Sequence, residues 1–274
     1  AAGLLDLWLV PLALLTVAAG TLGMLASRRL AQQAAYLVVV SAGTLLTAFG
    51  LGGAAAIAAG LYYLAHTTLA AAAMFLLADV ISRARGTLAD RLVTGPDLPR
   101  GQLLAGVFLL IAIAVSGLPP LSGFIGKWLI LQSSIGNPWM PWVFGVLLVT
   151  SLLGVMGLAR TGSQLFFDTD ADVEAGPTIR LLDLTAPLFL VFLVITLVVY
   201  AGPVYEFSRA AEVCLVEKFG VTADSGNNQY GQRRGIVPFT QGLKELEAAF
   251  LRHQYVQRDQ IGHRVIKLTE CIFT

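Results

Sequence analysis

Lys127 is the residue whose type and position most clearly suggest chemistry. Of the 18 Lys and Arg residues in the 274-residue chain, eight lie in loops between apolar segments and nine follow Pro203, which leaves Lys127 alone inside an apolar segment. A charge at the centre of a membrane span costs roughly 2.5–3.5 kcal/mol. Because desolvation disfavours a charged ammonium, a lysine in such a place can release and take up a proton. We interpret Lys127 as a proton-relay residue; the alternative is a lysine that snorkels to the membrane interface.

The residues before Lys127 predict a break in its helix, made by Gly117, Pro119, Pro120 and Gly123. Proline lacks a backbone donor and its ring clashes with the preceding turn, and glycine allows the chain to bend. Non-helical backbone at membrane depth is tolerated only where it is buried in protein or lines a wet cavity. Discontinuous helices of this kind mark ion sites in many transporters, which supports the relay. The alternative is a proline kink in a packed helix.

His66 is the second ionisable side chain in the middle of an apolar segment. Its imidazole titrates near neutral pH and can carry protons. Tyr63, about one turn earlier, and Thr67, the next residue, are candidates for supporting polar groups. A histidine can also serve as a structural hydrogen-bonding group between membrane helices, and this alternative stays open. We expect no metal site, because no second histidine or thiol lies near it in the sequence.

Asp79 lies near the end of the same segment as His66 and four residues before Arg83. This spacing places the two side chains on one face of a helix, where they can form an ion pair. An interfacial pair is one interpretation of Asp79, and an entrance for protons is the other.

These residues belong to a membrane protein by composition. The chain is 56% hydrophobic and only 13% charged, with a mean hydropathy of +0.75, whereas soluble domains carry roughly 25% charged residues. A lipid-facing surface needs no cover of charges, so the composition indicates a membrane protein. The net charge of +1 gives no indication of nucleic-acid binding. Cys214 and Cys271 are too few and too far apart for a disulfide framework or a metal site.

Six apolar segments have about the 20 residues that a membrane span needs. They cover residues 7–25, 31–51, 54–81, 103–132, 141–158 and 184–200, and the fourth contains the break before Lys127. Each must be helical, because lipid offers no partner for backbone polar groups. The sequence therefore predicts an all-α, polytopic membrane helix bundle over residues 1–205, with one discontinuous helix. Residues 206–239 are expected to form a linker, and residues 240–274 a polar tail with an amphipathic helix.

Basic residues lie in every second connection between the predicted spans. These residues are Arg28, Arg29, Arg83, Arg85, Arg91, Arg100, Arg160 and Arg180, whereas the connections 51–53 and 133–140 carry none. Positive loops stay in the cytoplasm, so we expect the basic loops there and both ends of the six-span unit outside. Asp168, Asp170 and Asp172 form a DxDxD string, but the later glycine and glutamate of a calcium loop are absent, which indicates a solvated acidic loop.

The stretch 117–127, GLPPLSGFIGK, resembles the broken-helix motif of multisubunit cation/proton antiporters of the Mrp type, also called Mnh, Sha or Pha. It is most similar to their D subunit, and the stretch 62–69 with the alanine run to Phe75 resembles the same component. These proteins are similar to the antiporter-like subunits of respiratory complex I. The resemblance covers about residues 1–215.

This resemblance implies a fourteen-helix subunit with two inverted five-helix repeats, of which the six spans are the last six, the second half of an antiporter-like fold. It identifies Lys127 as the charged residue of the second broken helix and His66 as the histidine of the preceding helix, with Ser122 of the motif as a supporting polar residue. The glutamate and lysine of the first repeat have no counterpart in this chain. Many relatives carry a lysine shortly after the histidine, where residues 70–73 are all alanine. A relay here must therefore use hydroxyl groups or water.

The resemblance implies an ion-translocating subunit in the bacterial inner membrane, not an enzyme, and no cofactor. It would exchange Na⁺ or K⁺ for protons. The implied partners are the lipid bilayer and the other antiporter subunits, including the missing N-terminal half or a homologous large subunit. Two alternatives stay open: a proton-pumping subunit of a quinone- or hydrogenase-linked complex similar to complex I, and a structural half-subunit without independent transport.

Overall fold

The computed structural model describes residues 2–96, 98, 100–168, 176–177 and 180–219, and all regular elements in these ranges are helical. The helices are α1 (Ala2–Ala26), α2 (Leu30–Leu51), α3 (Ala54–Ala84), η1 (Gly86–Leu88), α4 (Gly101–Ser116), α5 (Ser122–Ser133), α6 (Met140–Phe166), η2 (Leu181–Leu184), α7 (Thr185–Val199) and α8 (Ala201–Phe219). The elements η1 and η2 are single 3₁₀ turns. The prediction of an all-α membrane bundle is confirmed.

Five stretches of the described helices are long and apolar enough to cross a membrane. They are Trp8–Ala26, Leu30–Leu51, Ala54–Ala84, Met140–Phe166 and Leu181–Val199. These stretches coincide with five of the six predicted spans. The predicted fourth span is divided into α4 and α5, so the break predicted from Gly117, Pro119 and Pro120 is present.

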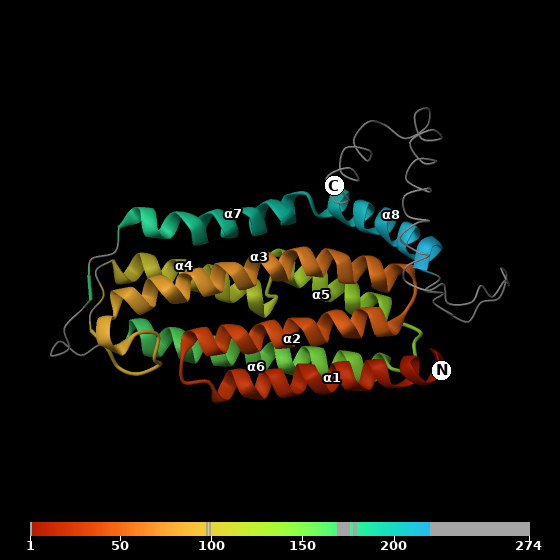
Figure 1. Cartoon of the computed structure of the whole chain (residues 1–274), viewed down its shortest axis with the longest axis horizontal. Helices are drawn as coiled ribbons and strands as arrows, with labels where there is room; N and C mark the ends of the chain where they lie inside the picture. Colours follow the sequence, from red (N-terminus) through yellow and green to blue (C-terminus); the bar gives the residue numbers. More distant parts are fainter. Residues whose placement is uncertain (1, 97, 99, 169–175, 178–179, 220–274) are drawn as a thin grey trace, which may run out of the picture.

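The helix α3 lies at the centre of the bundle, and Figure 1 shows α7 along one side of it and α2, α6 and α1 on the other. It packs against α2, α4, α5, α7 and α8, while α1 packs against α2 and α6. Many buried positions of α3 are small, among them Ala58, Ala59, Gly60, Ala70 and Ala73. Small residues let membrane helices approach closely, which explains how one helix can contact so many neighbours.

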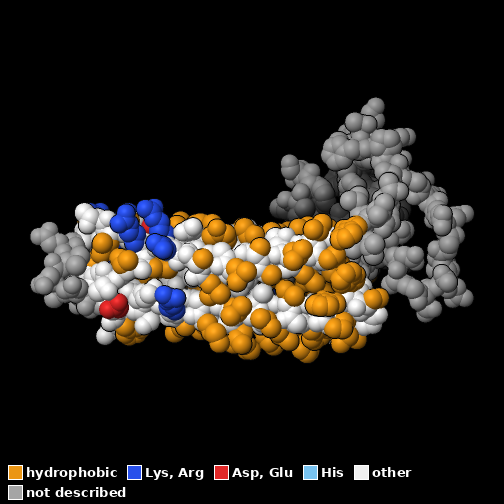
Figure 2. Space-filling view, turned by 90° about the horizontal axis from the view of Figure 1, so that it is seen from below, with side chains coloured by type: hydrophobic (Ala, Val, Ile, Leu, Met, Phe, Trp, Pro, Cys, Tyr) orange, Lys and Arg blue, Asp and Glu red, His pale blue; other side chains and the backbone are white. Residues whose placement is uncertain are grey.

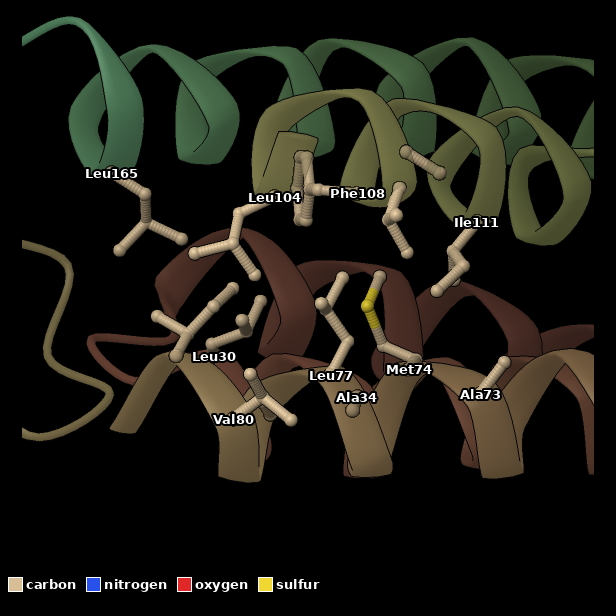
Figure 3. Close-up of a cluster of buried hydrophobic side chains, with 14 of the residues drawn as sticks. Leu30, Ala34, Ala73, Met74, Leu77, Val80, Leu104, Phe108, Ile111 and Leu165 are labelled. Atoms are coloured by element: carbon tan, nitrogen blue, oxygen red, sulfur yellow. The ribbon is translucent and has the colours of Figure 1, made fainter. Parts of the chain in front are cut away.

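A cluster of buried apolar side chains joins α2, α3, α4 and α6, as Figure 3 shows. Its labelled members are Leu30, Ala34, Ala73, Met74, Leu77, Val80, Leu104, Phe108, Ile111 and Leu165. In lipid, such contacts act through van der Waals packing, because lipid tails are as apolar as the side chains. This cluster holds the basic end of the bundle together and fixes how α4 approaches α3.

The face of the bundle in Figure 2 has a long apolar part, with the arginine side chains that it shows gathered towards one end. Apolar side chains such as Leu15, Leu22, Leu148 and Phe192 are exposed along the helices. This distribution matches a bundle surrounded by lipid, with arginine side chains at the end where the predicted basic loops lie.

Arg85, one of the basic residues of the loop after α3, is buried. Its side chain is only 1% exposed, and its guanidinium donates to the backbone carbonyls of Arg91 and Val93. Asp90 is also buried, and its carboxylate accepts a hydrogen bond from the backbone of Ala31 at the start of α2, 3.0 Å away. The loop is therefore folded onto the bundle, because its carbonyls and the first turn of α2 obtain partners from two charged side chains.

The predicted linker at 206–239 is wrong over residues 206–219, which form the greater part of α8. Gly202 and Pro203 lie in the first turn of α8, where the backbone N–H that proline lacks would have no carbonyl partner within the helix. Packing of α8 against α3 stabilises the helix further. The predicted polar tail at 240–274 lies outside the described residues, as do Asp170 and Asp172 of the acidic string.

Candidate functional site

The break between α4 and α5 positions Lys127. Helix α4 ends at Ser116, and Gly117 caps it in the left-handed conformation at φ +75°. Residues 117–121 form the connection, and α5 begins at Ser122. Gly123, which was predicted to belong to the break, instead lies in the first turn of α5. Of the four predicted break residues, Gly117, Pro119 and Pro120 thus lie in the connection, and Gly123 lies just after it.

The ammonium group of Lys127 is held at this break. Its Nζ donates to the backbone carbonyl of Ser116 at 2.8 Å and to Oγ of Ser151 on α6 at 3.0 Å. The side chain therefore reaches back along α5 towards the end of α4, away from the polar turn at Ser133. This direction differs from that of a lysine snorkelling to the nearer interface, and it gives the ammonium two of the three acceptors that it can use.

His66 on α3 is buried, with only 2% of its surface exposed. Its Nδ1 lies 2.8 Å from Oγ of Ser122, whose hydroxyl donates to the carbonyl of Val194 on α7 at 3.2 Å. The imidazole also forms a hydrogen bond with the backbone of Ala114 at the end of α4. Ser122 thus fixes the orientation of the imidazole and connects α3, α5 and α7.

Gly123 allows α5 to approach His66. A Cβ at this position would lie 2.3 Å from the carbonyl oxygen of Ala114 and 2.7 Å from Nε2 of His66. Real side chains do not pack at such distances, so glycine is required for the contact among α3, α4 and α5. The glycine that looked like a helix breaker in the sequence serves close packing instead.

Tyr63 lies between His66 and helix α2. Its ring centroid is 6.0 Å from that of His66, and its side chain is buried. The hydroxyl donates to Oγ of Ser41 on α2 at 3.4 Å and also interacts with the side chains of Thr44 and Thr67. The predicted supporting residues Tyr63 and Thr67 are therefore brought together with His66.

Two small cavities lie on either side of this hydroxyl cluster. The first, of about 10 Å³, is lined by His66 and Thr67 among others. The second, of about 20 Å³, is lined by Lys127 and Ser151 among others. Both share the wall residues Leu37, Ser41, Tyr63 and Val115. A buried water molecule needs a cavity of roughly 10–15 Å³, so each of these two cavities is about the size of one water.

Asp79 lies apart from this site. Its carboxylate is 2.7 Å from Arg83, and Arg83 is also 3.6 Å from Asp183. The predicted ion pair is thus present, with both partners well exposed. Thirteen residues separate Asp79 from His66 along α3, which corresponds to about 20 Å of helix.

The sequence interpretation missed Ser41, Thr44, Ser116 and Ser151. These residues come from three other helices and meet His66 and Lys127 only in the folded bundle. Each is a hydroxyl residue inside an apolar span, which is the signal that could have identified them. Within the ranges that the structure describes, no three His, Cys, Asp or Glu side chains gather as metal ligands.

Comparison with known proteins identifies the family. Residues 2–156 match the family model described as NADH:quinone oxidoreductase/Mrp antiporter, transmembrane. The chain is 33% identical over 232 residues to the D subunit of a probable K⁺/H⁺ antiporter of Rhizobium meliloti, covering 74% of this chain and 42% of that protein. It is 30% identical over 199 residues to the D subunit of the Na⁺/H⁺ antiporter of Alkalihalophilus pseudofirmus, covering 72% and 40%.

The fold agrees with this result. A chain of the Mrp complex from Dietzia sp. superposes with a TM-score of 0.68 at 20% identity, over 77% of this chain and 47% of that chain. The present chain spans less than half the length of these relatives. Because the family model covers more than half of the chain, the protein belongs to the NADH:quinone oxidoreductase/Mrp antiporter transmembrane family.

Proposed function

We propose that the chain is an ion-translocating part of a monovalent cation/proton antiporter, in which Lys127 and His66 carry protons. The observation that supports this most directly is the setting of Lys127. Its ammonium lies at the broken helix, bound to the Ser116 carbonyl and the Ser151 hydroxyl, beside a cavity of about 20 Å³. A lysine retained at such cost inside a membrane protein is typical of a proton or ion pathway.

His66 is the second group of this relay. It borders the neighbouring cavity, and its ring is close enough to Lys127 for their charges to interact. The similarity to subunits named for K⁺/H⁺ and Na⁺/H⁺ exchange supports Na⁺ or K⁺ as the exchanged cation. The first-repeat charges that the family uses would come from the other part of the subunit or from a homologous large subunit.

The proposed location is the bacterial plasma membrane, with the bundle in contact with lipid and other antiporter subunits. The arginine-bearing ends of α1, α2, α3 and α6 would face the cytoplasm, according to the positive-inside rule. The first of the six proposed spans would then begin on the outer side, and the last would end there. With Cys214 and Cys271 replaced by serine, labelling of single cysteines introduced next to Arg28 and next to Gly52 tests this orientation, since only the second should react with an impermeant reagent outside the cell.

Lys127→Ala in the assembled complex tests the proposed function. Inverted membrane vesicles should show cation-dependent proton flux with the native chain and none above background with the variant, at equal amounts of assembled protein. Unchanged flux in Lys127→Ala vesicles would show that the chain has another function, with a structural half-subunit as the first alternative.

A proton-pumping subunit of a complex related to NADH:quinone oxidoreductase is the second candidate, because the matching family includes both kinds of protein. The same Lys127 and His66 would then carry protons driven by electron transfer elsewhere. Purification of the complex decides between the two, since redox subunits would accompany the chain in one case and small antiporter subunits in the other.

A further inference from the structure

We infer that the hydroxyl groups of Ser41 and Tyr63 form the proton-transfer link between Lys127 and His66. The inference rests on the proposed function and assigns roles to two residues within it. Ser41 belongs to α2, which carries neither of the two ionisable residues. The link therefore makes α2 part of the proton path.

The placement of the two cavities is the first argument. Lys127 borders one cavity and His66 borders the other, and neither residue lines both. The wall between the cavities is made of two apolar residues, Leu37 and Val115, and two hydroxyl residues, Ser41 and Tyr63. A proton moving directly between the cavities must cross this wall, and only the hydroxyl groups can accept and release it.

The hydrogen bond inside the wall is the second argument. The Tyr63 hydroxyl donates to Oγ of Ser41 at 3.4 Å, and both side chains are buried. Each hydroxyl can donate one hydrogen bond and accept others, so the pair can pass a proton by exchanging which bonds its protons make. Thr44 on the Lys127 side and Thr67 on the His66 side also interact with the Tyr63 hydroxyl, which extends the polar contact into both cavities.

The transfer is balanced with one water molecule in each cavity. The observed bond, from Tyr63 O–H to Ser41 Oγ, serves transfer from His66 to Lys127, so transfer towards His66 requires that both hydroxyl groups first turn and Ser41 donates to Tyr63 Oη. Lys127 then releases a proton from Nζ to the first water, which passes one to Ser41 Oγ while Ser41 gives its own proton to Tyr63 Oη. Tyr63 gives its phenolic proton to the second water, and that water protonates His66. Lysine ends neutral, histidine ends charged, and both hydroxyl groups and both waters keep their number of protons. The reverse order returns the proton.

Tyr62 provides the contrast that separates a transfer role from a packing role. It is the preceding residue of α3 and is also buried, but its hydroxyl donates to the carbonyl of Leu197 on α7 at 3.3 Å. It lines neither cavity. Tyr62→Phe and Tyr63→Phe thus remove the same atom from neighbouring buried tyrosines, and only one of them borders the proposed path.

The test measures cation-dependent proton flux in vesicles that contain the assembled complex, normalised to the amount of this chain. Tyr63→Phe and Ser41→Ala should each lower the rate by about a hundredfold or more, which is the lower end of the range for a lost proton-transfer group. Ser41→Thr keeps a hydroxyl and should restore most of the rate. Tyr62→Phe should stay within about twofold of the native chain, because it loses one structural hydrogen bond.

The double variant Ser41→Ala/Tyr63→Phe should be no slower than the slower single variant, since both changes interrupt one path. Native rates in Tyr63→Phe and Ser41→Ala, together with no flux in Lys127→Ala, would overturn the link and leave the proposed function intact. Native flux in Lys127→Ala would overturn both. Ser41→Ala leaves the Tyr63 ring in place, so it carries the test in case Tyr63→Phe does not accumulate in the membrane.

Discussion

The side chain of Lys127 packs directly against Gly117, and its position requires the absence of a Cβ there. A Cβ on Gly117 would come within 2.9 Å of Cδ and 3.1 Å of Nζ of Lys127. Gly117 also has a φ of +75°, a conformation that glycine adopts without strain. The same residue thus ends α4 and leaves the space through which the lysine reaches the Ser116 carbonyl.

Gly117→Ala should therefore impair transport through both effects. The left-handed conformation costs a residue with a Cβ roughly 1–2 kcal/mol, and the new methyl group must displace the lysine side chain. We expect a lower rate of cation-dependent proton flux and a less thermostable complex. Gly106→Ala in α4 is the matched control, because a Cβ there meets nothing within 4 Å. Equal flux in the two variants would contradict the role given to Gly117.

Lys127→Arg should be nearly as inactive as Lys127→Ala. Arginine keeps the positive charge and can bond to Ser116 and Ser151, but guanidinium does not give up its proton under these conditions. The measurement is proton flux in vesicles over a range of cation concentrations. A rate close to that of the native chain would mean that Lys127 supplies only a fixed charge.

Ser151→Ala should weaken transport without abolishing it. The change removes one of the two hydrogen bonds of the ammonium, and a hydrogen bond to a charged group contributes about 1.5–3 kcal/mol. The remaining bond to the Ser116 carbonyl keeps Lys127 at the break. Ser163→Ala, an exposed position on the same helix α6, is the control and should behave as the native chain. A complete loss in Ser151→Ala would indicate that Ser151 itself transfers protons.

Arg85→Ala should loosen the loop after α3 and leave the transport residues in place. The carbonyls of Arg91 and Val93 lose their buried donor, at a cost of about 2 kcal/mol or more. In vesicles oriented so that the loop after α3 faces the added protease, limited proteolysis should cut this loop faster in Arg85→Ala than in the native chain. Arg28→Ala is the control, because Arg28 is exposed at the same end of the bundle. Equal cleavage in both variants would show that Arg85 does not hold the loop.

The sequence was sufficient to predict the framework of this bundle. Long apolar runs specify membrane helices by length alone, and two adjacent prolines before Lys127 specify a break. Lys127 and His66 were identifiable because ionisable groups are rare at membrane depth. These predictions depend on one segment at a time, which is why they could be made from residue types and spacing.

The partners of these residues could not be predicted in the same way. Ser151 meets Lys127 across 24 residues, and Ser122 meets His66 across 56, so each contact depends on how the helices pack. Gly123 was assigned to the break because local rules cannot distinguish a glycine that bends a chain from one that admits a neighbour. Arg85 was counted only as a basic loop residue, and its burial could not be predicted because its acceptors are backbone carbonyls, which every loop possesses.

The end of α4 has a further consequence for Lys127. The Ser116 carbonyl belongs to the last turn of that helix, where unpaired carbonyls and the helix dipole carry partial negative charge. A carboxylate in this position would lose its charge whenever it took up a proton, and the two partners would then titrate together. A backbone carbonyl oxygen does not take up a proton at physiological pH, so its partial charge stays constant. Lys127 thus has a constant counter-charge in this half of the site, so in the proposed relay the proton exchanged there would be that of Lys127 alone.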